Sequence, residues 1–147
     1  MTLQNVIIRK MRPEDAPEIG GIYQAITGIP AEEDVRKIIR EQAIKEDTAS
    51  FVALVEERVV GYMVSYILPG SFGLHKSAWI AMLGVSPSLM GRGIGEKLAR
   101  EILAFYQRAG IRDIYTSVRW DSTDLLSFFK TLGFDRSNFI NLHKELA

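Results

Sequence analysis

Residues 85–98 read Val-Ser-Pro-Ser-Leu-Met-Gly-Arg-Gly-Ile-Gly-Glu-Lys-Leu, and this stretch decides the fold that we expect. An apolar, strand-like run over 77–85 leads into a glycine-rich turn, which opens a helix with an apolar residue at every fourth position. Gly91, Gly93 and Gly95 remove side-chain bulk where the unpaired N–H groups of a helix start point outward, and the helix dipole favours an anion there. The turn therefore predicts a site for a phosphate-bearing ligand such as a pyrophosphate.

The remaining chain alternates between strand-like and helix-like patterns. The connection at 56–58 is short enough for an antiparallel hairpin, and the helix after the glycines is long enough for a right-handed crossover between two parallel strands. The count of strands predicts a mixed α/β (α+β) fold with a central sheet of six to seven strands, helices on both faces and a single domain over residues 1–147. We expect helices at about 14–27, 31–47, 94–109 and 122–132, strands at 6–11, 51–55, 59–68, 77–85 and 111–118, and a terminal strand or hairpin over 134–146.

The composition is that of one ordinary globular domain. The 147 residues are 47% hydrophobic and 24% charged, and 18 basic side chains balance 18 acidic ones, so no global field attracts nucleic acid or an anionic membrane. The absence of cysteine excludes disulfides, thiolate metal sites and a cysteine nucleophile, and with two histidines we expect no metal. The start of the sequence lacks a signal-peptide pattern, and no run of 18 apolar residues occurs, so we expect a soluble, cytoplasmic protein.

Two common phosphate-binding motifs do not fit the glycine-rich stretch. A dinucleotide-binding fingerprint needs a third glycine three positions after the second, and no position around Gly95 completes that pattern. A Walker-type loop needs Gly-Lys followed by Ser or Thr, whereas Gly95 is followed by Glu96 and Lys97. The sequence therefore matches neither motif.

The stretch resembles the acyl-CoA-binding motif of the GCN5-related N-acetyltransferases (GNAT), whose pattern is Gln/Arg-x-x-Gly-x-Gly/Ala. Gly93 and Gly95 match the two glycine positions, whereas Met90 departs from the first position. The preceding residues 83–87 are similar to the family's motif strand. Residues 121–134 resemble its last helix, usually Asn-x-x-Ala-x-x-Leu-Tyr-x-x-x-Gly-Phe, with Gly133 and Phe134 matching and with Ser122, Leu125 and Phe129 at the Asn, Ala and Tyr positions.

The resemblance implies a GNAT fold that binds acetyl-CoA as cosubstrate between the strands at 77–85 and 111–118. Backbone amides of Gly91 to Gly95 would then hold the pyrophosphate, with Arg92 and Lys97 adding charge. The pantetheine arm would pair with the motif strand, where Gly84 suggests a bulge that exposes backbone groups. The implied coenzyme-binding residues are Leu83, Val85, Met90, Gly91, Arg92, Gly93, Ile94, Gly95, Glu96, Ser122 and Phe129.

The general acid is not where the resemblance puts it. Acetyl transfer needs a proton for the departing thiolate, and Phe129 lacks the hydroxyl of the family's tyrosine. Ser122 is one candidate donor, and Tyr115 and Tyr66 are others. The alternatives are that Ser122 caps a helix, that the tyrosines are core residues and that water supplies the proton.

The general base is equally open. Trp79 stands where several family members have a glutamate, and residues 77–85 contain no carboxylate. His75 has a suitable ordinary pKa range and precedes that strand, although a histidine on the surface needs no such role. Asp121 and Asp124 fit helix caps or amine-binding anions better than bases, because a helix start stabilises their charged forms.

The sequence as a whole predicts an N-acetyltransferase that moves an acetyl group from acetyl-CoA to a primary amine. Its alternative is a non-catalytic acyl-CoA-binding regulatory module, which the phenylalanine at 129 and the missing strand carboxylate favour. A nucleic-acid-binding domain fits less well, because the charge is balanced and no basic aromatic stripe occurs. The acceptor, expected near the loops at 27–34 and 69–76, is not specified, and the apolar C-terminal strand is suited to pairing with a second copy in a homodimer.

Overall fold

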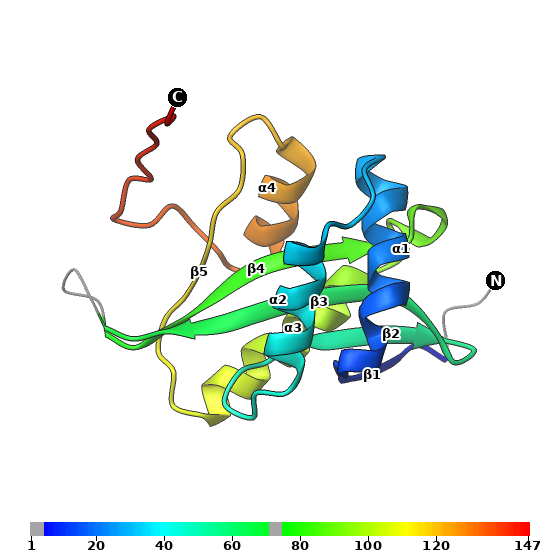
Figure 1. Cartoon of the computed structure of the whole chain (residues 1–147). Helices are drawn as coiled ribbons and strands as arrows, with labels where there is room; N and C mark the ends of the chain where they lie inside the picture. Colours follow the sequence, from blue (N-terminus) through cyan, green and yellow to red (C-terminus); the bar gives the residue numbers. More distant parts are fainter. Residues whose placement is uncertain (1–4, 71–74) are drawn as a thin grey trace. The chain divides into compact units, whose positions relative to one another are not determined.

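The computed structural model describes residues 5–70 and 75–147, so part of the loop expected at 69–76 lies outside the described residues. The chain forms two compact units, one up to Ser117 and one from Val118 onward. The first contains β1 (Ile7–Lys10), α1 (Ala16–Thr27), α2 (Glu33–Ala43), β2 (Phe51–Val55), β3 (Arg58–Leu68), β4 (Ser77–Val85), α3 (Ile94–Arg108) and β5 (Ile114–Thr116), and the second contains α4 (Thr123–Thr131) (Figure 1). No helix in these described ranges is long and apolar enough to cross a bilayer.

The sheet has the order β1-β2-β3-β4-β5, with every neighbouring pair antiparallel except β4 and β5, which are parallel. The predicted hairpin and crossover are thus confirmed. A two-residue turn at Glu56 and Glu57, both with positive φ, joins β2 to β3. Such a turn matches the twist of paired strands. The pairing then shifts by one residue between Ala53 and Leu54, which leaves Val60 as an extra residue of β3.

The expectation of six to seven strands is wrong, because the described residues form five. Residues 135–147 pair with no described strand, and their apolar side chains alternate too weakly to define a buried face. An isolated terminal hairpin without a packed face is marginal in water. The large apolar side chains of this segment are exposed: Phe139, Ile140, Leu142 and Leu146.

Helices cover the sheet on both of its faces in the first unit (Figure 1). Side chains from α1 and α2 pack with Val52, Tyr62 and Val64 of the sheet in one core cluster. On the opposite face, α3 approaches β3 closely at Gly61, where an added Cβ would lie 3.1 Å from Ile94 and 3.3 Å from Leu98. This close packing fixes the start of α3 against the sheet, next to the end of β4.

Candidate functional site

The connection from β4 to α3 is held at its start by the backbone. The Ser86 N–H donates to the Val60 carbonyl oxygen at 2.8 Å, and the Leu89 N–H donates to the Ser86 carbonyl oxygen at 2.8 Å. The Leu89 side chain is buried, whereas Met90 is 51% exposed. Residues 90–96, which we call the glycine turn, follow this anchored segment, and Met90 to Gly93 are exposed to solvent.

Two glycines of the glycine turn adopt a backbone conformation that other residues avoid. Gly91 has φ +78° and Gly93 has φ +83°, both in the left-handed region, where a Cβ costs roughly 1–2 kcal/mol. A Cβ added to either one would meet no atom within 4 Å. The space on the Cβ side of both glycines is therefore open, and the positive φ rather than a steric contact is what favours glycine there.

Gly93 is the N-cap of α3 and has no side chain to cap the helix. The Lys97 N–H donates to the Gly93 carbonyl oxygen at 3.1 Å, which begins the helical hydrogen bonding. The N–H groups of Ile94, Gly95 and Glu96 come before this bond and therefore have no acceptor within the helix. Unpaired amides at the positive end of a 15-residue helix are suited to binding a phosphate.

The side chains of the glycine turn differ in what they can contribute. Ile94 is 1% exposed and packs in the core, so only its backbone faces a ligand. Glu96 accepts a hydrogen bond from Arg100 at 2.7 Å, which partly offsets its negative charge. Arg92 and Lys97 are exposed and add positive charge beside the unpaired amides.

β4 separates from β5 close to the glycine turn. The parallel pairing covers only Ala78–Ile80 of β4 and Ile114–Thr116 of β5. At the last pair, the Thr116 hydroxyl donates to the Ile80 carbonyl oxygen at 3.0 Å. Beyond Ile80, residues 82–85 pair with β3 but with no other strand among the described residues. Alternate residues of that segment therefore present backbone N–H and C=O groups at an open edge.

The bulge that we expected at Gly84 lies elsewhere. The pairing of β3 with β4 shifts between Val64 and Ser65, which leaves Ala81 as the extra residue of β4. Gly84 is in regular register opposite Tyr62, and a Cβ there would lie 2.7 Å from the Tyr62 ring. Gly84 thus permits close approach of an aromatic ring, while the bulge marks the point where β4 leaves β5.

Tyr62 fills the place that a side chain at position 84 would occupy. The residue is 2% exposed, and burial raises the pKa of its phenol to about 12, with a smaller contribution from Tyr23. The phenol is therefore neutral at physiological pH. Sequence reasoning missed this contact because the partner of Gly84 lies 22 positions earlier in the chain, although a glycine within a strand was the available signal.

Of the residues considered as acid or base in the first unit, Tyr66 and Tyr115 lie on either side of Trp79 in the sheet, whereas His75 lies outside β4. His75 is exposed and precedes β4, six residues before Ala81, which corresponds to ~20 Å along an extended strand. Trp79 stacks on Tyr115 with 4.9 Å between ring centroids, and its indole N–H donates to the Ser77 hydroxyl at 3.1 Å. The structure therefore brings neither a histidine nor a carboxylate from β4 to the bulge.

Ser122 and Phe129 belong to the second unit. Ser122 is the N-cap of α4, but its hydroxyl makes no capping hydrogen bond. The Phe129 ring contacts Phe128 and Phe134 edge-on, with 5.1 Å between centroids in both pairs. The exposed Asp121 pairs with Arg119 at 3.0 Å, and this hydrogen bond lowers its pKa, so it stays anionic.

No group of three or more metal-ligating side chains occurs among residues 5–70 and 75–147. The arrangement instead combines unpaired amides at a helix start with an open strand edge. The first suits a diphosphate, and the second suits a peptide-like chain that hydrogen-bonds as a strand does. Coenzyme A carries both groups, so the residues present fit it.

Comparisons with known proteins agree with this reading. A mycothiol acetyltransferase of Amycolatopsis mediterranei (strain U-32) is 31% identical over 107 residues, which are 71% of this chain and 35% of that protein. The N-alpha-acetyltransferase RimI of Mycobacterium tuberculosis (strain ATCC 25618 / H37Rv) is 43% identical over 54 residues, 37% of this chain and 32% of that protein. The matches thus span about a third of the length of these curated relatives.

The fold also matches solved structures. An aminoglycoside N-acetyltransferase solved in complex with CoA superposes with a TM-score of 0.79 at 16% identity, covering 100% of both chains. Residues 16–134 match the profile of the Acetyltransferase (GNAT) family. The matched residues include β4, the glycine turn and α4. This chain therefore belongs to the acetyltransferase (GNAT) family.

Proposed function

We propose that this protein is an N-acetyltransferase that transfers an acetyl group from acetyl-CoA directly to a primary amine. The observation that carries the proposal is the glycine turn, where unpaired amides of α3 adjoin the open edge of β4. The family match over residues 16–134 includes parts of both compact units, which supports a single acetyltransferase domain over residues 1–147.

The proposed coenzyme contacts follow from the geometry of the first unit. The backbone of Met90 to Glu96 would hold the pyrophosphate, with Ile94 contributing only its N–H because its side chain is buried. Leu83 and Val85 lie on the open edge of β4, where backbone groups can pair with the pantetheine arm. Ser122 and Phe129 are included from the family resemblance alone.

The proposed reaction needs few dedicated side chains. A neutral amine attacks the thioester carbonyl, the C–N bond forms, the C–S bond breaks, the amine loses one proton and the thiolate gains one. Backbone N–H groups on β4 can polarise the carbonyl, and holding both reactants together supplies much of the rate. The Ser122 hydroxyl makes no capping hydrogen bond to α4, so it is one candidate proton donor, and water is the other source of the proton.

The acceptor is proposed only as a class. The relatives are named as mycothiol, N-alpha and aminoglycoside acetyltransferases, so their names point to different acceptors. Two of these names state that the acetyl group goes to nitrogen, which supports an amine acceptor here. The loops at 27–34 and 69–76 remain our expectation for the residues that select it.

A screen of amine acceptors separates catalysis from binding alone. Acetyl-CoA would be incubated with the protein and with small amines, amino acids, aminoglycosides and peptides that have free N-termini, and thiol release would be followed. We expect turnover above the rate of hydrolysis with at least one amine class. Binding of acetyl-CoA without release for any acceptor would instead support the non-catalytic acyl-CoA-binding module.

A further inference from the structure

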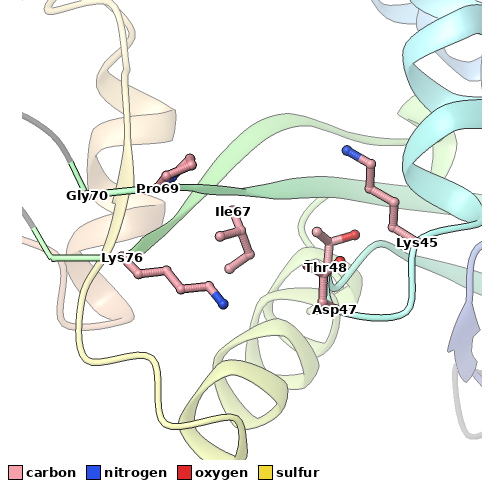
Figure 2. A pocket seen from close by; sticks show the side chains of 7 residues that line it. All are labelled: Lys45, Asp47, Thr48, Ile67, Pro69, Gly70 and Lys76. Carbon is pink, nitrogen blue, oxygen red and sulfur yellow. The ribbon is translucent and has the colours of Figure 1, made fainter.

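A hollow lies at the other end of β4 from the glycine turn. It has a volume of about 530 Å³ and is lined by residues of the α2–β2 connection and of the facing ends of β3 and β4 (Figure 2). The length of β4 separates the two places by roughly 26 Å at ~3.3 Å per residue. We call this hollow the lysine pocket, and its lining residues are Lys45, Asp47, Thr48, Ile67, Pro69, Gly70 and Lys76.

Two lysine side chains line the lysine pocket, and Asp47 is the one carboxylate in its described lining. Lys45 and Lys76 extend into it from opposite sides, as Figure 2 shows. Among the described residues, neither has a carboxylate within 4.0 Å, although Asp47 lies in the same wall. The lining therefore carries two positive charges and one negative charge, and a single added anion would neutralise it.

The backbone beneath this charge is fixed. The Lys10 ammonium donates to the Lys45 carbonyl oxygen at 2.7 Å, which holds the α2–β2 connection against β1. Next in the chain, the Ala49 N–H donates to the Tyr106 hydroxyl at 2.9 Å, and that hydroxyl lies 2.6 Å from the Ser65 hydroxyl. The wall of the pocket thus rests on a buried network whose hydroxyls all have partners.

Thr48 is the exception in this wall. The residue is 2% exposed, and its hydroxyl has no hydrogen-bond partner among the residues that the structure describes. Buried polar groups in native proteins are nearly always paired, and the shielded Thr48 oxygen could gain a partner in the hollow only by turning toward it. Rotation about χ1 brings a threonine hydroxyl from one staggered position to another, which allows it to turn toward an occupant.

We propose that the lysine pocket binds a small organic carboxylate with a short apolar tail. Its carboxylate would lie between Lys45 and Lys76, whose flexible stems let both ammonium groups reach one anion. Its tail would lie on Ile67 and Pro69, the apolar residues of the lining. The volume of the pocket exceeds what a bare inorganic anion needs, and the single excess positive charge matches a monoanion.

An NMR titration of the uniformly ¹⁵N-labelled chain tests the proposal without any acetyl-transfer assay. Butyrate is the probe, butylamine is the control of opposite charge, and inorganic phosphate is the control without a tail. We expect butyrate to shift the amide signals of Thr48, Ile67 and Gly70 and to leave those of Gly91 and Gly93 unchanged. No shift with butyrate, or an equal response to butylamine or phosphate, would overturn the proposal.

Substitutions of the charged lining residues test whether each one strengthens or weakens butyrate binding. Lys45→Gln and Lys76→Gln should each weaken butyrate binding about tenfold, whereas Asp47→Asn should strengthen it. Lys37→Gln is the matched control, because Lys37 lies on α2 and pairs with Glu41 at 3.9 Å, away from the pocket. Unchanged affinity in the Lys45→Gln, Lys76→Gln double variant would contradict the assignment, and circular dichroism checks that each variant is folded.

Discussion

Replacing Gly93 with aspartate is expected to abolish binding of CoA while leaving the chain folded. The new carboxylate would stand at the start of α3, beside the amides that are proposed to hold the pyrophosphate. Placing like charges next to each other costs several kcal/mol, which corresponds to a loss of affinity of roughly 100-fold or more. Isothermal titration calorimetry of the variant with CoA measures the loss.

The control for this variant is Gly110→Asp. Gly110 has φ +79°, and an added Cβ there meets no atom within 4 Å, so the two substitutions impose similar backbone strain. Gly110 follows the other end of α3, which is ~22 Å long at ~1.5 Å per residue. Full affinity for CoA in Gly93→Asp, or an equal loss in Gly110→Asp, would place the pyrophosphate elsewhere.

Gly84→Ala is expected to destabilise the protein although it adds only one methyl group. That methyl would lie 2.7 Å from Cε1 of Tyr62 and 2.9 Å from its Cζ and hydroxyl oxygen. The Tyr62 ring is buried in the cluster beneath α1 and α2 and has no free space to enter. Overpacking of this kind costs about 1–3 kcal/mol, which urea denaturation measures as a lower free energy of unfolding.

The matched substitution for that experiment is Gly21→Ala. Gly21 lies within α1, and a Cβ there meets no atom within 4 Å. Alanine in a helix interior is more stable than glycine by roughly 0.5–1 kcal/mol, so this variant should gain stability. The opposite signs separate a steric clash at Gly84 from a general intolerance of alanine, and a Gly84→Ala protein as stable as the parent would contradict the contact.

Local signals predicted most of the first unit. Gly28, which has φ +74°, ends α1 as expected, and the short connection after Val55 forms the expected hairpin. The conformation of the glycine turn was predictable because it depends on glycines that are neighbours in the sequence, and the coenzyme contacts proposed there need only backbone amides. Patterns of this kind need no knowledge of distant residues.

The errors come from features that depend on pairing between distant segments. The bulge at Ala81 is set by how β3 and β4 align, and no residue type marks it, whereas Gly84 attracted the prediction because glycine is rare in strands. The expected terminal strand over 134–146 lacked a partner among the described strands. A pattern along one segment says nothing of whether a neighbouring edge is available.

The catalytic part of the site was harder to predict than the coenzyme part for a related reason. An acid or base acts only where several elements bring it to the reacting atoms, and its residue type alone does not define that place. His75 illustrates the difficulty, because its chemistry suits a base while β4 carries it away from the bulge. Ser122 remains a candidate proton donor, because its hydroxyl makes no capping hydrogen bond and because of the family resemblance.

The central claim is that unpaired amides at the start of α3 and the open edge of β4 bind coenzyme A. The most direct test is an NMR titration of the ¹⁵N-labelled chain with CoA, read at individual amides. We predict that the signals of Ile94, Gly95 and Glu96 shift together with those of residues 81–85. Saturation with CoA at millimolar concentration that leaves these amides unchanged would contradict the account.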